Sequence, residues 1–172
     1  AGVPVDVTGG TSFGAIVAML QALDLDWRAM RDVMWETVGR DGAPLDITVP
    51  TIALSKGQRL VDVLTRAFDD ARIEDAWLRA FCVSSNLSTG HSLVHTSGSI
   101  VGALRASVAI PGVFPPVASA DGEVLVDGAV MNNLPVDVMA EFSSGGPIIA
   151  VNLRSPADLV AGDLPTSGII SG

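Results

Sequence analysis

Ser12 is the residue of this chain whose surroundings in the sequence best suit nucleophilic chemistry. It lies in Gly10-Thr11-Ser12-Phe13-Gly14, directly after the apolar, β-branched run 3–8 and directly before the apolar run 15–20. A strand, a sharp turn flanked by glycines and then a helix form a nucleophile elbow, which lifts the serine hydroxyl into the open. The pattern predicts that Ser12 can attack a carbonyl carbon, while the Phe13 amide and the helix N-terminus stabilise the oxyanion.

Two other interpretations fit the same segment. Ser12 can be an ordinary N-cap of the helix, in which case the glycines serve only the turn. The run Gly9-Gly10-Thr11-Ser12 before a helix can also cradle a phosphate group. No lysine follows in the Gly-Lys-Ser/Thr order of a P-loop, so nucleotide binding is the less favoured of the two.

Asp127 is the candidate general base for Ser12. The two histidines, His91 and His95, both precede it, so the chain order Ser, Asp, His of an α/β-hydrolase triad is absent. A structural or surface role is expected for each histidine. Asp127 follows a short apolar strand and precedes Gly128, which places its carboxylate at the edge of a sheet, although Asp-Gly is also a common turn pair. In a dry cleft the pKa of a carboxylate rises, and it can then accept the serine proton.

Charge and composition exclude several classes of partner and cofactor. The chain has 10 Lys and Arg against 19 Asp and Glu, a formal net charge of −9, which argues against nucleic acid and against a basic patch for anionic lipid. Cys82, the single cysteine, lies in an apolar run and is predicted to be a small buried hydrophobe. No His, Cys and carboxylate cluster has the spacing of metal ligands, so we expect no metal and no cofactor.

Predicted strands and helices alternate along most of the 172 residues. Strands are expected at 3–8, 81–87, 92–96, 124–126 and 148–153, and helices at 13–23, 26–38, 57–68, 99–108 and 135–142. Asp24 or Asp26 is expected to cap the second helix, and Ser55 the third. The alternation predicts an α/β fold with a mainly parallel sheet and helices on both faces. No interior linker stands out, so one domain over 1–172 is expected.

Three segments, in this order along the chain, resemble the patatin-like phospholipase family. They are Gly-Gly-Thr-Ser-Phe-Gly-Ala at 9–15, Arg-Ala-Ser at 105–107 followed by Ala-Ile-Pro-Gly-Val-Phe-Pro-Pro at 109–116, and Val-Asp-Gly-Ala at 126–129. Further segments are similar to the neuropathy target esterase branch of that family and its bacterial relatives. These are 73–77, 94–96, 127–135 and 162–163.

The resemblance implies a three-layer α/β/α fold and a Ser–Asp dyad without histidine. Ser12 is then the nucleophile, and Asp127 the base of an Asp-Gly-Gly/Ala motif that includes Gly128 and Ala129. Gly10, Phe13 and Gly14 form the elbow and the oxyanion site. The implied activity is hydrolysis of phospholipid or lysophospholipid esters through an acyl-enzyme. Such a protein would contact membrane surfaces transiently and lie in the cytoplasm or at the periphery of a membrane.

The beginning of the chain departs from the family pattern. The family starts with a strand and a loop, Gly-Gly-Gly-x-Arg/Lys-Gly, whose amides complete the oxyanion hole, and this chain starts at Ala1-Gly2-Val3-Pro4. The resemblance therefore implies an N-terminal truncation that removes the first strand, the loop and the first helix, and leaves a strand edge open. A missing N-terminal segment or an oligomer partner would complete the sheet. The alternative function is a non-catalytic fragment or interaction module with an incomplete oxyanion hole.

Overall fold

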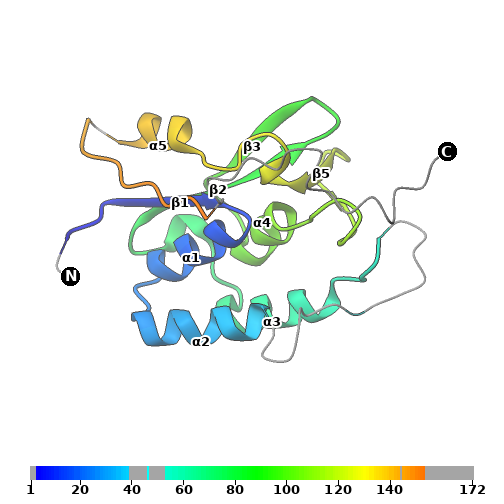
Figure 1. The fold of residues 1–172 in the computed structure, drawn as a ribbon, viewed down its shortest axis with the longest axis horizontal. Coiled ribbons are helices and arrows are strands. Elements are labelled where there is room, and N and C mark those ends of the chain that lie inside the picture. The colour runs from blue at the N-terminus through cyan, green and yellow to red at the C-terminus, as the bar shows by residue number, and fades with distance from the viewer. Residues whose placement is uncertain (1–2, 39–45, 47–52, 144, 154–172) are drawn as a thin grey trace, which may run out of the picture.

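The chain folds as a mixed β-sheet with helices on both faces (Figure 1). The computed structural model describes residues 3–38, 46, 53–143 and 145–153. The strands are β1 (Val7–Thr11), β2 (Arg79–Asn86), β3 (His91–His95), β4 (Val117–Ala118) and β5 (Val124–Asp127). The α-helices are α1 (Phe13–Ala22), α2 (Trp27–Val38), α3 (Gln58–Phe68), α4 (Ile100–Ser107) and α5 (Val136–Phe142), and short 3₁₀ turns occupy Ile73–Asp75 and Gly128–Val130.

Strand β2 is the centre of the sheet, and three of the other strands pair with it. β1 pairs with it in parallel, from Val7 opposite Arg79 to Thr11 opposite Val83. β3 and β5 pair with it in antiparallel fashion, and β4 is antiparallel to β5. The α/β class is as predicted, but the sheet is mixed, and β1–β2 is the parallel pair among the described strands. A tight hairpin and short returning strands explain this, because neither needs the crossover helix of a parallel connection.

Alternate side chains of β2 point into two separate cores. Ala80 and Cys82 pack with α1, α3 and α4, whereas Phe81 and Val83 pack with α5, where the Phe81 and Phe142 rings stack with centroids 5.1 Å apart. Burial raises the pKa of the Cys82 thiol to about 12, so this cysteine is the inert buried hydrophobe that was predicted. Helices α1 to α4 lie on one side of the sheet and α5 on the other, which gives three α/β/α layers (Figure 1).

Strand β1 begins later and ends later than predicted, because its glycines belong to the strand. A Cβ on Gly9 would lie 2.2 Å from the Phe81 ring, and one on Gly10 would lie 2.5 Å from the backbone of Gly14. Only glycine therefore lets β1 pass this close to β2 and to the start of α1. Within the described residues β1 pairs with β2 alone, so its other edge has no partner strand there.

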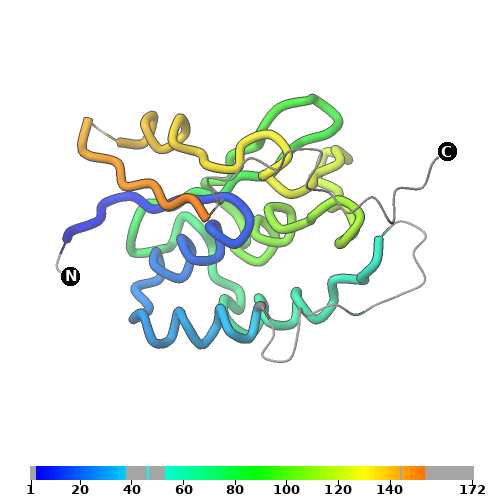
Figure 2. The backbone as a smooth tube through the Cα atoms, viewed as in Figure 1, coloured from blue at the N-terminus to red at the C-terminus, as the bar shows by residue number. Residues whose placement is uncertain are grey.

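The strand predicted at 148–153 does not form, although the segment is rich in β-branched residues. Residues 147–153 run as an extended trace without strand pairing (Figure 2), and Ile149, Val151 and Leu153 are 79%, 75% and 91% exposed. A strand needs a neighbour to satisfy its backbone groups, and no described strand pairs with this one. The prediction was wrong for the described residues because it rested on composition alone.

The helix caps follow the sequence in part. The Asp26 carboxylate accepts hydrogen bonds from the Arg28 and Ala29 amides, which confirms it as the cap of α2. The Ser55 hydroxyl accepts a hydrogen bond from the Gly57 amide before α3, but the Asp46 carboxylate also accepts from the Gly57 and Gln58 amides. Asp46 was not predicted, because it lies nine residues before Ser55 in a stretch without a clear pattern.

None of the described helices combines the length and the apolar character needed to cross a membrane.

Candidate active site

Ser12 lies at the strained turn between β1 and α1. Its backbone has φ 54° and ψ −126°, a conformation that residues with a side chain rarely adopt. The carbonyl of Ser12 accepts hydrogen bonds from the Ala15 and Ile16 amides, so the residue occupies the N-cap position of α1. Its hydroxyl makes no capping hydrogen bond to the helix. The Ser12 side chain therefore does not cap α1, contrary to the N-cap interpretation.

The pairing of the sheet brings Ser12 to Asp127, across 115 positions of sequence. β1 pairs with residues 79–83 of β2, and β5 pairs with residues 84–86. Since β3 occupies the opposite edge of β2 over 82–86, β1 and β5 share one edge and meet end to end. Their C-terminal ends lie next to each other, because Thr11 is opposite Val83 and Asp127 is opposite Ser84. The Ser12 hydroxyl donates a hydrogen bond of 2.6 Å from Oγ to Oδ2 of Asp127.

The carboxylate of Asp127 is buried and held from two sides. Its residue is 3% exposed, and Oδ1 accepts a hydrogen bond of 2.8 Å from the Ala129 amide. Its own amide donates to the Ala109 carbonyl at 2.9 Å. Burial raises the pKa of Asp127 above the ordinary value of an aspartate, although the hydrogen bonds from Ser12 and Ala129 oppose that shift. The arrangement can accept a proton from Ser12 more readily than an exposed carboxylate can.

Ser107 anchors the turn from the opposite side. Its hydroxyl oxygen accepts a hydrogen bond of 2.9 Å from the Ser12 amide and donates one of 2.6 Å to the Val83 carbonyl. The side chain is fully buried at the end of α4. The sequence places Ser107 only within the Arg-Ala-Ser segment and predicts no role for it. Its contact with the turn could not be foreseen, because it depends on where α4 packs against β2.

The first turn of α1 presents amides beside the Ser12 hydroxyl. The N–H groups of Phe13 and Gly14 lie in the first turn, where an α-helix offers them no carbonyl, and neither donates a hydrogen bond within the described part of the chain. The helix adds the positive end of its dipole at this point. The position suits an anion that forms on an atom bonded to Ser12 Oγ. Phe13 itself, the residue that follows the serine, is 37% exposed.

Two glycines allow the backbones around the site to approach one another. A Cβ on Gly10 would lie 2.5 Å from the backbone of Gly14 and 2.8 Å from the Ala15 nitrogen. A Cβ on Gly128 would lie 2.3 Å from the Val83 carbonyl oxygen and 2.8 Å from Cγ2 of Thr11. A Cβ on Gly14 would meet no atom within 4 Å. Gly10 and Gly128 are therefore required by close packing, and Gly14 is not.

Substitution of the elbow glycines tests this difference. Gly10→Ala is expected to lower the free energy of unfolding by about 1–3 kcal/mol, because the new methyl group overlaps backbone atoms of α1 that cannot move alone. Gly14→Ala is the matched control, and it is expected to change that free energy by less than about 1 kcal/mol, in the stabilising direction, because alanine favours helix. Urea unfolding of the three proteins measures both. Equal stability of the two variants would contradict the packing argument.

Neither histidine contacts the Ser12–Asp127 pair in the described part of the chain. Nε2 of His95 lies 2.8 Å from the Ser84 hydroxyl, and burial lowers the pKa of this imidazole, which favours its neutral form. His91 is exposed at the start of β3. The structure thus places His95 in a side-chain contact within the β2–β3 hairpin, where it supports the sheet.

The fold and the site together define an α/β/α protein in which a strand–turn–helix unit presents a serine to a buried aspartate. The model of the patatin-like phospholipase family matches residues 1–140. The chain belongs to that family.

Similar proteins come from fungi and bacteria. The chain is 36% identical over 162 residues to lysophospholipase nte1 of Aspergillus fumigatus, covering 92% of this chain and 10% of that protein. It is 38% identical over 154 residues to an uncharacterised NTE family protein of Mycobacterium tuberculosis, covering 90% and 26% respectively. It thus spans a tenth to a quarter of these relatives. The crystal structure of VipD from Legionella pneumophila shares the fold, with a TM-score of 0.51 at 12% identity, covering 75% of this chain and 41% of VipD.

Proposed function

We propose that this chain is the catalytic domain of a lipid-ester hydrolase that acts on phospholipids or lysophospholipids. The observation that carries the proposal is the hydrogen bond of 2.6 Å between the hydroxyl of Ser12, at a strained elbow, and the buried carboxylate of Asp127. Membership of the patatin-like phospholipase family and the similarity to a protein named lysophospholipase support the choice of a lipid ester as substrate.

The proposed reaction proceeds in two halves through an acyl-enzyme. Oγ of Ser12 attacks the ester carbonyl carbon while its proton passes to Asp127, and the Phe13 amide donates a hydrogen bond to the resulting oxyanion. The tetrahedral intermediate collapses, the bond to the alcohol oxygen breaks, and Asp127 returns the proton to the leaving alcohol. Water then attacks the acyl carbon while Asp127 accepts a proton of that water. The bond from the acyl carbon to Ser12 Oγ breaks, Asp127 returns the proton to Oγ, and the fatty acid leaves.

Asp127 can perform this role without a histidine because of its surroundings. An aspartate in water is far too weak a base for a serine hydroxyl. Burial destabilises the charged carboxylate and raises its pKa, which increases its tendency to take up a proton. The Ala129 amide holds Oδ1, so that Oδ2 stays aimed at Ser12 and no reorientation is needed during the reaction.

Covalent labelling with a fluorophosphonate ester tests the proposal most directly. The probe phosphonylates an activated serine, and mass spectrometry of the digested protein locates the modified residue. We expect the folded chain to be labelled at Ser12, and the same chain unfolded in urea to remain unlabelled, because activation depends on the fold. A folded chain that resists labelling would instead support the alternative function, a non-catalytic module of the same fold.

The pH dependence of hydrolysis follows from the raised pKa of Asp127. The carboxylate must be ionised to act as a base, so activity is expected to fall as the pH decreases through this pKa and to level off above it. The midpoint of the acidic limb should lie above the value of about 3.9 for an unperturbed aspartate. The profile of kcat/KM for a soluble p-nitrophenyl ester measures it. His95→Gln should leave the midpoint of the acidic limb unchanged. A midpoint that moves with this substitution would show that the limb does not report the titration of Asp127 alone.

A further inference from the structure

The end of α4 and the two residues after it contact both members of the Ser12–Asp127 pair. The Ser107 hydroxyl oxygen accepts a hydrogen bond of 2.9 Å from the Ser12 amide. Two residues further on, the Ala109 carbonyl accepts a hydrogen bond of 2.9 Å from the Asp127 amide. One short segment, 107–109, is thus bonded to the backbone of the nucleophile and to the backbone of the proposed base.

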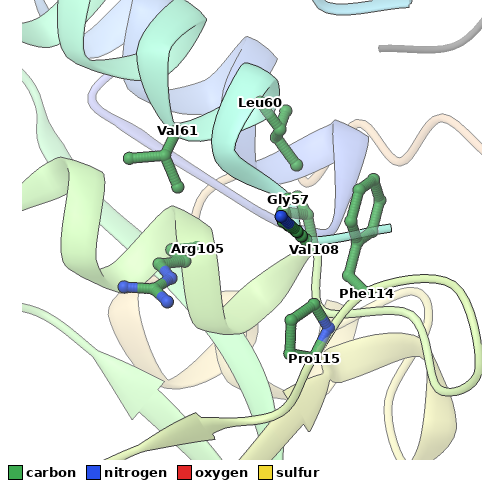
Figure 3. A pocket seen from close by; sticks show the side chains of 8 residues that line it. Gly57, Leu60, Val61, Arg105, Val108, Phe114 and Pro115 are labelled. Atoms are coloured by element: carbon green, nitrogen blue, oxygen red, sulfur yellow. The ribbon is translucent and has the colours of Figure 1, made fainter. Parts of the chain in front are cut away.

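The 107–109 segment is fixed by the core on its other side. Each of its three residues is 3% exposed or less. Val108 belongs to the apolar cluster that joins α1, α3 and α4, and it lines a small hollow together with Leu60 of α3 and Phe114 of the following loop (Figure 3). The Val108 amide donates to the Leu104 carbonyl at 2.9 Å, which continues the hydrogen bonding of α4. Because the interior is closely packed, the segment is a rigid support for the pair.

The hydroxyl of Ser107 is held in one direction. An amide only donates and a carbonyl only accepts, so this hydroxyl accepts from Ser12 and donates its proton, at 2.6 Å, to the Val83 carbonyl. A serine within a helix commonly bonds to a carbonyl of its own helix instead. Both partners of Ser107 lie outside α4, so its hydroxyl connects α4 with β2 and with the turn that carries the nucleophile.

The bond to Ser107 also determines which groups of the turn face the reaction. The Ser12 amide is occupied, whereas the Phe13 and Gly14 amides donate no hydrogen bond within the described part of the chain. The occupied amide helps to keep Ser12 at its strained φ of 54°, which sets the direction in which Oγ leaves the backbone. Release of this amide would let the turn relax and would weaken the contact of 2.6 Å between Oγ and Oδ2 of Asp127.

We propose that Ser107 is a positioning residue for the reaction. Its hydroxyl holds the elbow in the conformation in which Ser12 Oγ contacts Asp127 and the first amides of α1 are left for the oxyanion. Ser107 acts through the Ser12 amide and takes no part in proton transfer. The inference rests on the proposed function for its effect on the rate, whereas its geometric part is measurable without substrate.

Amide hydrogen exchange of the unchanged chain, followed by NMR, tests the bond itself. The Ser12 amide should exchange at least about tenfold more slowly than the amides of Phe13 and Gly14, which are exposed and donate no hydrogen bond within the described residues. This measurement does not depend on the folding of any variant. A Ser12 amide that exchanges as fast as that of Gly14 would overturn the proposal.

Ser107→Ala removes the hydroxyl and keeps a residue that favours helix. For a soluble p-nitrophenyl ester kcat should fall about 10–100-fold, while KM changes by less than about twofold, because alignment is lost and substrate contacts are kept. The hydrogen bond from Ser12 lowers the pKa of Asp127. A weakened bond should therefore move this pKa to higher pH, both in the acidic limb of the rate profile and in NMR of the carboxyl carbon without substrate.

Ser99→Ala is the matched control. The Ser99 hydroxyl oxygen also accepts a hydrogen bond from a backbone amide, that of Gly102, but it does so at the opposite end of α4 from Ser107. The control should leave kcat, KM and the pKa of Asp127 unchanged. An equal loss of kcat in Ser99→Ala would overturn the proposal.

The outcomes for Ser107→Ala separate this inference from the proposed function. A kcat equal to that of the unchanged chain would overturn the inference, and so would a lowered kcat with an unaltered pKa of Asp127, which would show a structural effect only. If the unchanged chain neither hydrolyses esters nor is labelled at Ser12, the proposed function is rejected. The pKa of Asp127 in the two variants then still decides whether Ser107 fixes the pair.

Discussion

Ser12→Ala is expected to reduce ester hydrolysis by at least about 10⁴-fold and to abolish fluorophosphonate labelling. The substitution removes the atom that forms the acyl-enzyme, so neither the Asp127 carboxylate nor the amides of α1 can compensate. Residual activity would come from water attacking a bound ester, helped by the oxyanion donors alone. Initial rates on a soluble p-nitrophenyl ester, measured at saturating and at low substrate, separate this loss from weaker binding.

The control for Ser12→Ala is Ser92→Ala, which changes an exposed serine on β3 whose side chain makes no hydrogen bond within the described part of the chain. Its rate should equal that of the unchanged chain. The Ser12→Ala protein should keep its circular dichroism spectrum, because the Ser12 backbone amide still donates to Ser107. A folded Ser12→Ala protein that still hydrolyses the ester at a comparable rate would remove Ser12 from the mechanism.

Asp127→Asn is expected to reduce hydrolysis by about 10³–10⁴-fold while leaving the protein at least as stable at neutral pH. Asparagine keeps the shape of the side chain, and its carbonyl oxygen can still accept from the Ala129 amide. Its NH₂ group cannot accept the proton of Ser12. The stability follows from the sign of the pKa shift: because burial raises the pKa of Asp127, ionisation costs more in the folded chain than in the unfolded one.

The link between the pKa of Asp127 and stability gives a second measurement on the same variant, the pH dependence of its free energy of unfolding. The unchanged chain should lose stability as the pH rises through the unfolded pKa toward the raised folded pKa of Asp127, and Asp127→Asn should lack that contribution. Asp121→Asn is the matched control, since Asp121 is also followed by glycine but is exposed at a turn. It should change neither activity nor this part of the stability profile. An Asp127→Asn protein with normal activity would show that Ser12 uses another base.

The local signals in the sequence were reliable where a residue's neighbours along the chain decide its conformation. The elbow is an example: Gly10, Ser12 and the apolar run after it predicted a strand, a sharp turn and a helix, and the structure has β1, the positive φ of Ser12 and α1 in that order. The cap at Asp26 and the buried Cys82 are of the same kind. The family motifs also predicted the patatin-like fold, which the comparisons bear out.

Local signals failed where a neighbour in space decides the outcome. Residues 148–153 have the composition of a strand, yet the described structure gives them no strand to pair with. Alternation of strands and helices predicted a mainly parallel sheet, but alternation cannot tell which strands return directly beside their predecessor. β3 and β5 both run antiparallel to β2, and this was decided by the hairpin and by the short β4–β5 return.

By itself, then, the sequence determined the two candidate residues, Ser12 and Asp127, the strained turn that carries Ser12 and the class of fold. Each depends on backbone preferences and on apolar patterns that act over a few residues. Only the tertiary structure decided that β1 and β5 meet end to end along one edge of β2, which brings Ser12 Oγ within 2.6 Å of Asp127. It also decided that Ser107 holds the turn. These contacts join residues far apart in sequence, and they exist only because burial of the two apolar faces of β2 fixes the helices against the sheet.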